Sequence, residues 1–152
     1  MGGINVLCTD KTGTLTENSL RIADLNSVDG DKSLLLRANL AAQTMGGQKS
    51  NDAFDRAISL SLDEDIVRSL SSYQFLRDMP FDPVKRRNTV LTKEGSRLIM
   101  VTKGEPGEIL RLCIDGEEQF KQYQSWIVDR GRQGKRILAI ASKESLEESI
   151  NL

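Results

Sequence analysis

Histidine is absent from this sequence of 152 residues. Its absence excludes Ser-His-Asp triads, Cys-His dyads and zinc sites built on histidine. Cysteine is scarce, because only Cys8 and Cys113 are present, and they lie far apart and outside any Cys-x-x-Cys motif or metal-ligand spacing. Such sparse use of cysteine favours a reducing compartment over a disulfide-stabilised fold.

Long hydrophobic runs and an excess of one charge are also missing. No window approaches the roughly 20 apolar residues of a membrane-spanning helix, and no charged start followed by an apolar run indicates a secretory signal. The net charge of -1 does not indicate binding to nucleic acid or to an anionic membrane. With 38% hydrophobic and 28% charged residues, the chain has the composition of a globular domain with a core.

The pattern of apolar residues predicts helices and antiparallel strands in separate blocks. In chain order we expect a strand over 4–9, a strand over 20–25, a helix over 33–45, a helix over 53–60 capped within 50–52, a helical turn over 66–70, strands over 73–81, 88–92 and 97–102, a helix from Pro106, an amphipathic helix over 117–129 and a strand over 136–141. We therefore predict the α+β class, with an antiparallel twisted sheet flanked by helices. The first strand is expected to belong to a different domain.

Asp10 stands where the first apolar run gives way to small polar residues. A carboxylate at a strand end can attack phosphorus and form an acyl phosphate, and Mg2+ then offsets the charge between the two groups. Gly13 permits close backbone approach, so that amides can cradle a phosphoryl group, while Thr14 adds a hydroxyl and Lys11 a positive charge. For an arbitrary Asp-x-x-Gly the alternative is a surface turn with a solvated aspartate.

The heptad over 10–16 resembles, letter for letter, the phosphorylation motif of P-type cation-transporting ATPases. This resemblance implies a haloacid-dehalogenase-like phosphorylation domain in which Asp10 is the phosphorylated nucleophile. It also implies that Mg2+ is held by Asp10 and the carbonyl of Thr12. The residues that it assigns to phosphate binding are Lys11, Thr12, Gly13 and Thr14.

Position 12 distinguishes a pump from a soluble phosphatase of that fold. Such phosphatases usually carry a second aspartate two residues after the nucleophile, where this chain has Thr12. Without an adjacent general base the acyl phosphate is expected to be long-lived, which suits a pump that must store the intermediate.

Three further stretches resemble the family's nucleotide-binding domain. The stretch over 79–87 is similar to the Pro-Phe-Asp-Pro-Val segment of plasma-membrane proton pumps, in which the phenylalanine stacks on adenine. The stretch over 102–106 is similar to a Lys-Gly-Ala-Pro motif, with Glu105 in place of alanine as a carboxylate expected to weaken nucleotide binding unless it faces solvent. The stretch over 51–58 resembles the segment whose acidic residue hydrogen-bonds the adenine amino group. That residue is Asp55 by register, with Asp52 as the alternative.

The resemblance also places two arginines near the phosphates. Arg86 stands where the family has a lysine, and Arg136 matches an arginine on the hinge side, both able to make charge-assisted hydrogen bonds. The residues thereby assigned to ATP or ADP are Asp55, Phe81, Arg86, Lys103, Gly104 and Arg136. Read without the family, Phe81 is a core residue, Asp55 a helix-surface acid, and the basic side chains are solvated.

The expected organisation follows from these motifs. We expect a fragment of the phosphorylation domain over 1–18, a nucleotide-binding domain over 19–142, and a tail over 143–152 that leads back to the phosphorylation domain. The absence of histidine excludes the heavy-metal branch, which carries a His-Pro pair, and the motifs look closest to the proton-pump and magnesium-pump branches.

The resemblance further implies a cytoplasmic piece of a longer pump in the cell membrane. The parent is expected to couple ATP hydrolysis, through an aspartyl phosphate, to cation transport. The piece itself is expected to be a monomer that binds ATP or ADP, meets the remaining pump domains, binds no nucleic acid and does no chemistry alone. The alternatives are a haloacid-dehalogenase-type phosphatase with an inserted cap and a regulatory ATP-binding module.

Overall fold

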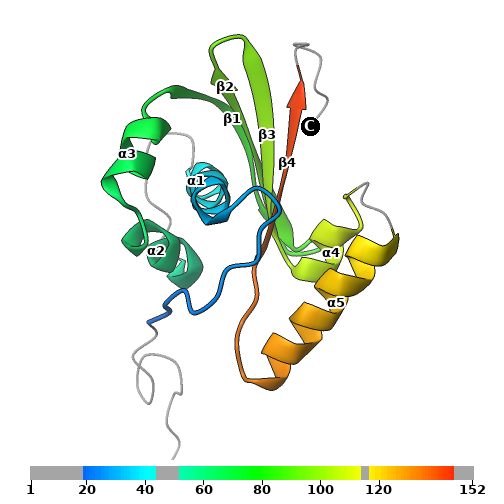
Figure 1. Cartoon of the computed structure of the whole chain (residues 1–152). Coiled ribbons are helices and arrows are strands. Elements are labelled where there is room, and N and C mark those ends of the chain that lie inside the picture. Colours follow the sequence, from blue (N-terminus) through cyan, green and yellow to red (C-terminus); the bar gives the residue numbers. More distant parts are fainter. Residues whose placement is uncertain (1–18, 44–51, 114–116, 146–152) are drawn as a thin grey trace, which may run out of the picture.

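The computed structural model describes residues 19–43, 52–113 and 117–145 of the chain (Figure 1). Its helices are α1 (Asp31–Ala41), α2 (Ala53–Leu60), α3 (Glu64–Leu70), α4 (Pro106–Leu110) and α5 (Glu117–Arg132). Its strands are β1 (Tyr73–Asp82), β2 (Arg87–Glu94), β3 (Arg97–Gly104) and β4 (Ala139–Ser145). The α+β class and the antiparallel sheet flanked by helices are thus confirmed. No helix in these described ranges is long and apolar enough to cross a membrane.

The four strands form one antiparallel sheet in the order β1-β2-β3-β4. Because neighbouring strands run in opposite directions, the ends of β1 and β3 meet the starts of β2 and β4 at one end of the sheet. The register fixes this end, since Arg87 pairs with Gly104 and Gly104 pairs with Ala139. We refer to it as the Gly104 end.

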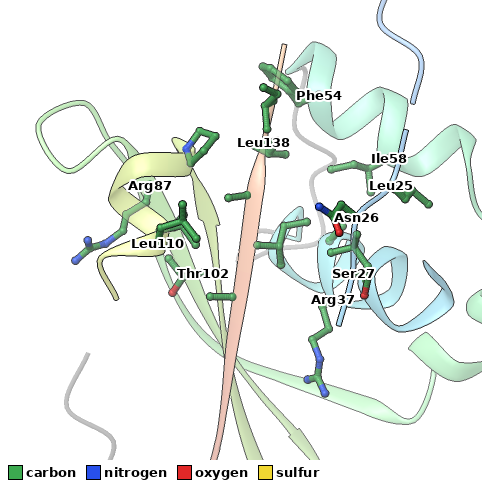
Figure 2. A pocket seen from close by; sticks show the side chains of 18 of the residues that line it. Leu25, Asn26, Ser27, Arg37, Phe54, Ile58, Arg87, Thr102, Leu110 and Leu138 are labelled. Atoms are coloured by element: carbon green, nitrogen blue, oxygen red, sulfur yellow. The ribbon is translucent and has the colours of Figure 1, made fainter. Parts of the chain in front are cut away.

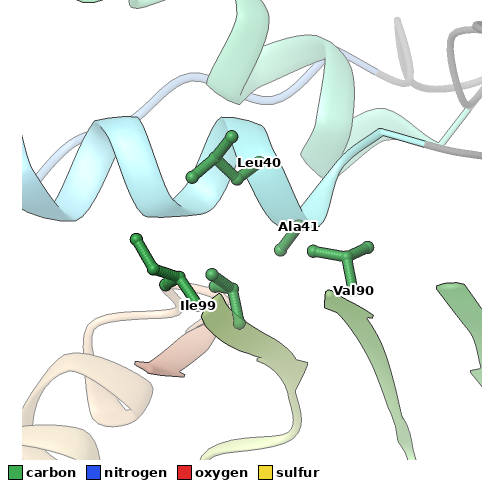
Figure 3. Packing of buried hydrophobic residues seen from close by; sticks show 5 residues of the cluster. Leu40, Ala41, Val90 and Ile99 are labelled. Carbon is green, nitrogen blue, oxygen red and sulfur yellow. The ribbon is translucent and has the colours of Figure 1, made fainter. Parts of the chain in front are cut away.

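The sheet lies between two layers of helices. Figure 1 shows α1, α2 and α3 gathered on one side of it, and α4 and α5 on the other. A core cluster lies between α1 and the sheet, where Leu40 and Ala41 face β2 and β3 (Figure 3). Its buried members are Leu40, Ala41, Val90, Ile99 and Val101. Full burial of each larger aliphatic side chain contributes about 1.5–3 kcal/mol, so this cluster anchors α1 to the centre of the sheet.

Helix α1 is shorter at its end than the predicted helix over 33–45. It begins at Asp31 and ends at Ala41, because the hydrogen-bond pattern changes there. The amide of Gln43 donates to the carbonyl of Leu40 at 3.2 Å, which is a tighter turn than an α-helix. The Asn88 side chain donates to the carbonyl of Ala41 at 2.7 Å, so β2 takes the acceptor that a further helical turn would use.

The strand predicted over 20–25 is wrong. Residues 19–30 contain no strand or helix, and Ile22, which the alternation would bury, is 37% exposed. A segment with alternating apolar residues forms a strand only where a neighbouring strand can pair with it. In the described part of the chain β4 pairs with β3 alone, so it does not pair with residues 20–25. The strand predicted over 4–9 lies outside the described residues.

The last strand starts later and runs further than the prediction over 136–141. It begins at Ala139, the residue that pairs with the final residue of β3, and continues to Ser145. The other predicted elements are confirmed with small changes at their ends. Asp52 is the capping residue of the predicted group, since its Oδ1 accepts from the amide of Phe54 at 3.0 Å.

Candidate functional site

The sheet topology brings the predicted nucleotide-binding residues from separate motifs to the Gly104 end. Phe81 is the second-last residue of β1, and Arg86 directly precedes β2. Lys103 and Gly104 close β3, while Arg136 lies shortly before β4. Since β2 separates β1 from β3, the backbones at Phe81 and Lys103 lie roughly 10 Å apart, two strand spacings.

Gly104 has no room for a side chain. A Cβ built on it would lie 2.4 Å from the carbonyl oxygen of Arg86 and 2.6 Å from the Cβ of Arg87. The amide of Glu105 donates to the same Arg86 carbonyl at 3.0 Å, which ties the turn before β2 to the end of β3. Arg86 has a φ of 49°, a left-handed conformation that costs a non-glycine residue about 1–2 kcal/mol. The close approach therefore fixes Arg86 beside Gly104.

Asp55 and Lys103 form a buried ion pair. Asp55 projects from α2, Lys103 from the face of β3 that α1 and α2 cover, and the Lys103 ammonium donates to Oδ1 of Asp55. Each residue is only 7% exposed. Two of the predicted nucleotide-binding residues are thus in direct contact, 48 positions apart in sequence. Asp52, the register alternative, is exposed and is used as the cap of α2.

Phe81 is on the surface, with 62% of its area exposed. The side chain is therefore not part of the core, and its ring is accessible to a ligand. Val84, in the following turn, is 88% exposed. Asp82 shapes this turn, as its Oδ1 accepts from the amides of Val84 and Lys85 at 2.8 and 3.2 Å. The Lys85 and Val84 amides hold the pKa of the Asp82 carboxyl below its ordinary value, despite a smaller opposing effect of desolvation.

Glu105, the departure from the expected alanine, begins helix α4. Its carboxylate accepts from the amide of Glu108 at 2.9 Å and serves as the N-cap. Burial raises the pKa of Glu105, but hydrogen bonds from the Gly107 and Glu108 amides and the nearby arginines Arg86 and Arg111 outweigh it, so the pKa lies below its ordinary value. The carboxylate thus has a local structural use at the edge of the Gly104 end.

The phosphorylation motif is not part of the described structure. The residues that lie outside it are Asp10, Lys11, Thr12, Gly13 and Thr14. Within the described ranges, no group of three or more Cys, Asp or Glu side chains is arranged to hold a metal ion. The predicted Mg2+ ligands Asp10 and Thr12 therefore remain a prediction.

A cavity of about 1160 Å³ runs along β4 and extends between both helix layers. Figure 2 shows Leu25, Ile58 and Arg37 on one side of β4 and Leu110 and Thr102 on the other. Of the six predicted nucleotide-binding residues, Arg136 alone lines this cavity. The cavity reaches the Gly104 end, because Arg87 and Ala139 line it, and its walls carry charged and aromatic side chains beside the apolar ones. We place the candidate site at the Gly104 end because the other five predicted nucleotide-binding residues meet there and do not line the cavity.

One charged cluster was missed by the sequence analysis. Asp24 pairs with Nε of Arg130 at 3.2 Å and with the ammonium of Lys135. The Arg130 guanidinium also lies over the ring of Trp126, 5.6 Å from its centre. Sequence separation hides this cluster, since Asp24 and Lys135 are 111 positions apart.

Comparison with known proteins gives a consistent group of relatives. The chain is 35% identical to a plasma membrane ATPase of Zygosaccharomyces rouxii, with 94% of the chain aligned. It is 30% identical to a probable cation-transporting P-type ATPase of Mycoplasma genitalium over 94% of the chain, and 32% identical to a putative cation-transporting ATPase of Methanocaldococcus jannaschii over 93%. No protein-family model matches the chain. These curated relatives are P-type ATPases, and the chain spans 16–17% of their length.

Proposed function

We propose that this chain is the ATP-binding part of a P-type cation-transporting ATPase. The observation that carries the proposal is the meeting, at the Gly104 end, of residues from three separate motifs. Asp55 contacts Lys103, Gly104 closes against Arg86, and Phe81 is exposed on the neighbouring strand. The relatives at 30–35% identity support the same assignment, because each is named as an ATPase.

The residues at this end suit the parts of an adenine nucleotide. The Phe81 ring offers a stacking face for the base, worth about 1–3 kcal/mol. Asp55 presents a carboxylate that can accept from the adenine amino group, and its pairing keeps Lys103 in place beside it. Arg86 and Arg136 are exposed cations that can donate charge-assisted hydrogen bonds to the phosphates.

In the parent protein we assign the chemistry to the motif over 10–14. A carboxylate oxygen of Asp10 attacks the γ-phosphorus of ATP, the bond from that phosphorus to the β-phosphate oxygen breaks, and ADP leaves, while Thr14 and the backbone at Gly13 hold the transferred group. Lys11 adds positive charge. Asp10 and the Thr12 carbonyl are the proposed Mg2+ ligands, and the ion supplies charge neutralisation during phosphoryl transfer.

The proposal extends to the setting of the parent protein. The Gly104 end faces ATP or ADP, the remaining pump domains supply the rest of the catalytic machinery, and the transported cation passes through the membrane part of the parent pump. We place the chain on the cytoplasmic side of the cell membrane and expect it to be a monomer. The motifs around Asp55 and Phe81 favour the proton-pump and magnesium-pump branches.

Titration with ATP and ADP tests the proposal. We expect a dissociation constant of roughly 0.1–10 mM, about -2.7 to -5.5 kcal/mol, because the exposed Phe81 ring and the two arginines offer only a few contacts to the nucleotide. Isothermal calorimetry is a suitable method. The absence of any response at about 20 mM ATP, well above that range, rejects the proposal.

A further inference from the structure

The cluster around Asp24 joins two distant segments of the chain. The segment over 19–30 has no helix or strand of its own, and Asp24 attaches it to the end of α5 and to the turn that follows. Asp24 is exposed, while Arg130 and Lys135 are half-buried. We call these three residues the Asp24 clasp. Exposed ion pairs of this kind stabilise a fold little, so their position matters more than their strength.

The clasp lies directly beside one of the proposed phosphate-binding residues. After α5 the chain turns at Gly134, whose φ of 75° suits glycine, and the Lys135 amide donates back to the carbonyl of Arg130 at 3.1 Å. Arg136 follows at once. Three residues later, Ala139 pairs with Gly104 and starts β4. Arg136 is therefore held between two anchors, the clasp on one side and the sheet pairing on the other.

Arg136 has little else to hold it. The stretch over 135–138 has no regular structure, Arg136 is exposed, and it forms no ion pair with another residue in the described ranges. A long side chain in such a stretch depends on its backbone anchors for its direction. Release of Lys135 from Asp24 removes the side-chain anchor nearest to Arg136 and leaves the hydrogen bond from the Lys135 amide to the Arg130 carbonyl.

We propose that Asp24 is a positioning residue for nucleotide binding, which holds Arg136 toward the phosphates through Lys135 and Arg130. The inference rests on the proposed function. It also gives the segment over 19–30 a role, since this segment follows the Asp10 motif in the chain. The position of the segment over 19–30 then affects the direction of Arg136 toward the phosphates.

The direction of the mutational effect separates positioning from simple electrostatics. Asp24→Asn removes a negative charge near Arg136, so Coulomb attraction alone strengthens the binding of an anion such as ATP. Loss of positioning weakens it instead. Asp29→Asn is a matched control, because Asp29 lies on the same segment, is exposed and undergoes the same change of charge.

The test compares ATP with AMP, which lacks the outer phosphates. NMR titrations of the 152-residue chain are made for the wild type, Asp24→Asn, Asp24→Glu and Asp29→Asn. For Asp24→Asn we expect the dissociation constant for ATP to rise about 3–10-fold and that for AMP to change less than about 2-fold. Asp24→Glu should recover most of the ATP affinity, and Asp29→Asn should bind both nucleotides as the wild type does.

Three results overturn the inference. These are unchanged or tighter ATP binding by Asp24→Asn, an equal loss for ATP and AMP, or an equal loss in Asp29→Asn. If Asp24→Asn does not fold, Asp24→Ser is measured in its place with the same expectations, because it also removes the carboxylate that pairs with Lys135 and Arg130. A wild-type chain that binds no ATP rejects the proposed function and this inference with it, whereas wild-type binding with an unaffected Asp24→Asn rejects the inference alone.

Discussion

Exposure divides the residues at the Gly104 end into two groups. Asp55 and Lys103 are buried together, so each one satisfies the other's charge in a place that water hardly reaches. Phe81 and Arg136 are exposed, and the fold does not need their side chains for packing. Substitutions in the first group should therefore change stability as well as binding, whereas substitutions in the second should change binding alone.

Replacement of Phe81 tests the exposed group. Phe81→Ala should weaken ATP binding by about 1–3 kcal/mol, or roughly 5–150-fold, because the base loses its stacking face. The melting temperature should hardly move, since the ring is 62% exposed. Val84→Ala is the control, as it truncates a more exposed apolar side chain in the adjacent turn. A large drop in melting temperature with unchanged affinity per folded molecule contradicts the assignment.

A double-mutant cycle tests the buried group. Asp55→Ala and Lys103→Ala should each lower the free energy of unfolding by about 3–5 kcal/mol, because each leaves one charge buried and unpaired. The double variant should lose clearly less than the sum, since no unpaired charge remains. Urea unfolding measures all four proteins. Additive losses would mean that the two side chains do not interact as the structure describes.

Short elements at the Gly104 end depend on single local contacts. Helix α4 has five residues, too few to be stable by itself, and it relies on Pro106 at its start and on the Glu105 cap. The turn before β2 likewise relies on the Asp82 carboxylate and on the contact of Arg86 with the Gly104 backbone. These contacts set the shape of the site more than the core does.

The Glu105 cap should give a pH-dependent contribution to stability. Its pKa is lowered in the folded chain, so the contribution is present above the unfolded value of about 4.3 and is lost as the pH falls through the lower folded value. The melting temperatures of wild type and Glu105→Gln should thus differ at pH 7 and converge below about pH 4. A difference that stays constant across this range contradicts the assigned role.

Two glycine substitutions test the close approach at the end of β3. Gly104→Ala should destabilise the fold by about 1–3 kcal/mol, because the new methyl group meets the Arg86 carbonyl and the Arg87 side chain. Gly131→Ala, in α5 with open space around it, should instead stabilise by about 0.5–1 kcal/mol. Thermal unfolding of both variants checks the pair. If Gly104→Ala leaves the stability unchanged, the contact of Gly104 with Arg86 and Arg87 is looser than the structure describes.

The elements that were predicted correctly are those whose sequence pattern matches their surroundings. The strands over 73–102 carry apolar residues in strand-like patterns and follow one another through short turns, so pattern and pairing agree. The segment over 20–25 has a similar alternation, but no strand in the described part of the chain pairs with it. Local pattern predicts a strand's tendency, whereas its pairing depends on residues far away in the sequence.

The site was predicted to a similar extent and for a related reason. Motifs identified Lys103 and Asp55 as individual residues, but their direct pairing depends on how α2 packs over β3. The use of Glu105 as a helix cap fits its position directly before Pro106, the first residue of α4. The sequence analysis predicted only the effect of its charge on the nucleotide. The Asp24 clasp had no local pattern, since its partners come from the other end of the chain.

At the scale of the whole molecule, the antiparallel topology makes the site. The strand order places the ends of β1 and β3 beside the starts of β2 and β4. The predicted site residues between Phe81 and Arg136 therefore come together although they lie far apart in the sequence. The cavity along β4 also reaches this end, where Arg87 and Ala139 line it, but its lining shares only Arg136 with the predicted nucleotide-binding residues. Where a nucleotide binds is therefore the central question.

A residue-resolved NMR titration with ATP answers it most directly. The account predicts that amide shifts concentrate at the Gly104 end, around Phe81, Arg86, Lys103 and Gly104, and saturate with a dissociation constant of roughly 0.1–10 mM. The amides of α3 (Glu64–Leu70), which contains none of the predicted nucleotide-binding residues, serve as the internal reference. Shifts confined to the cavity lining, such as Leu110 and Leu25, or no shifts at about 20 mM ATP, would contradict the account.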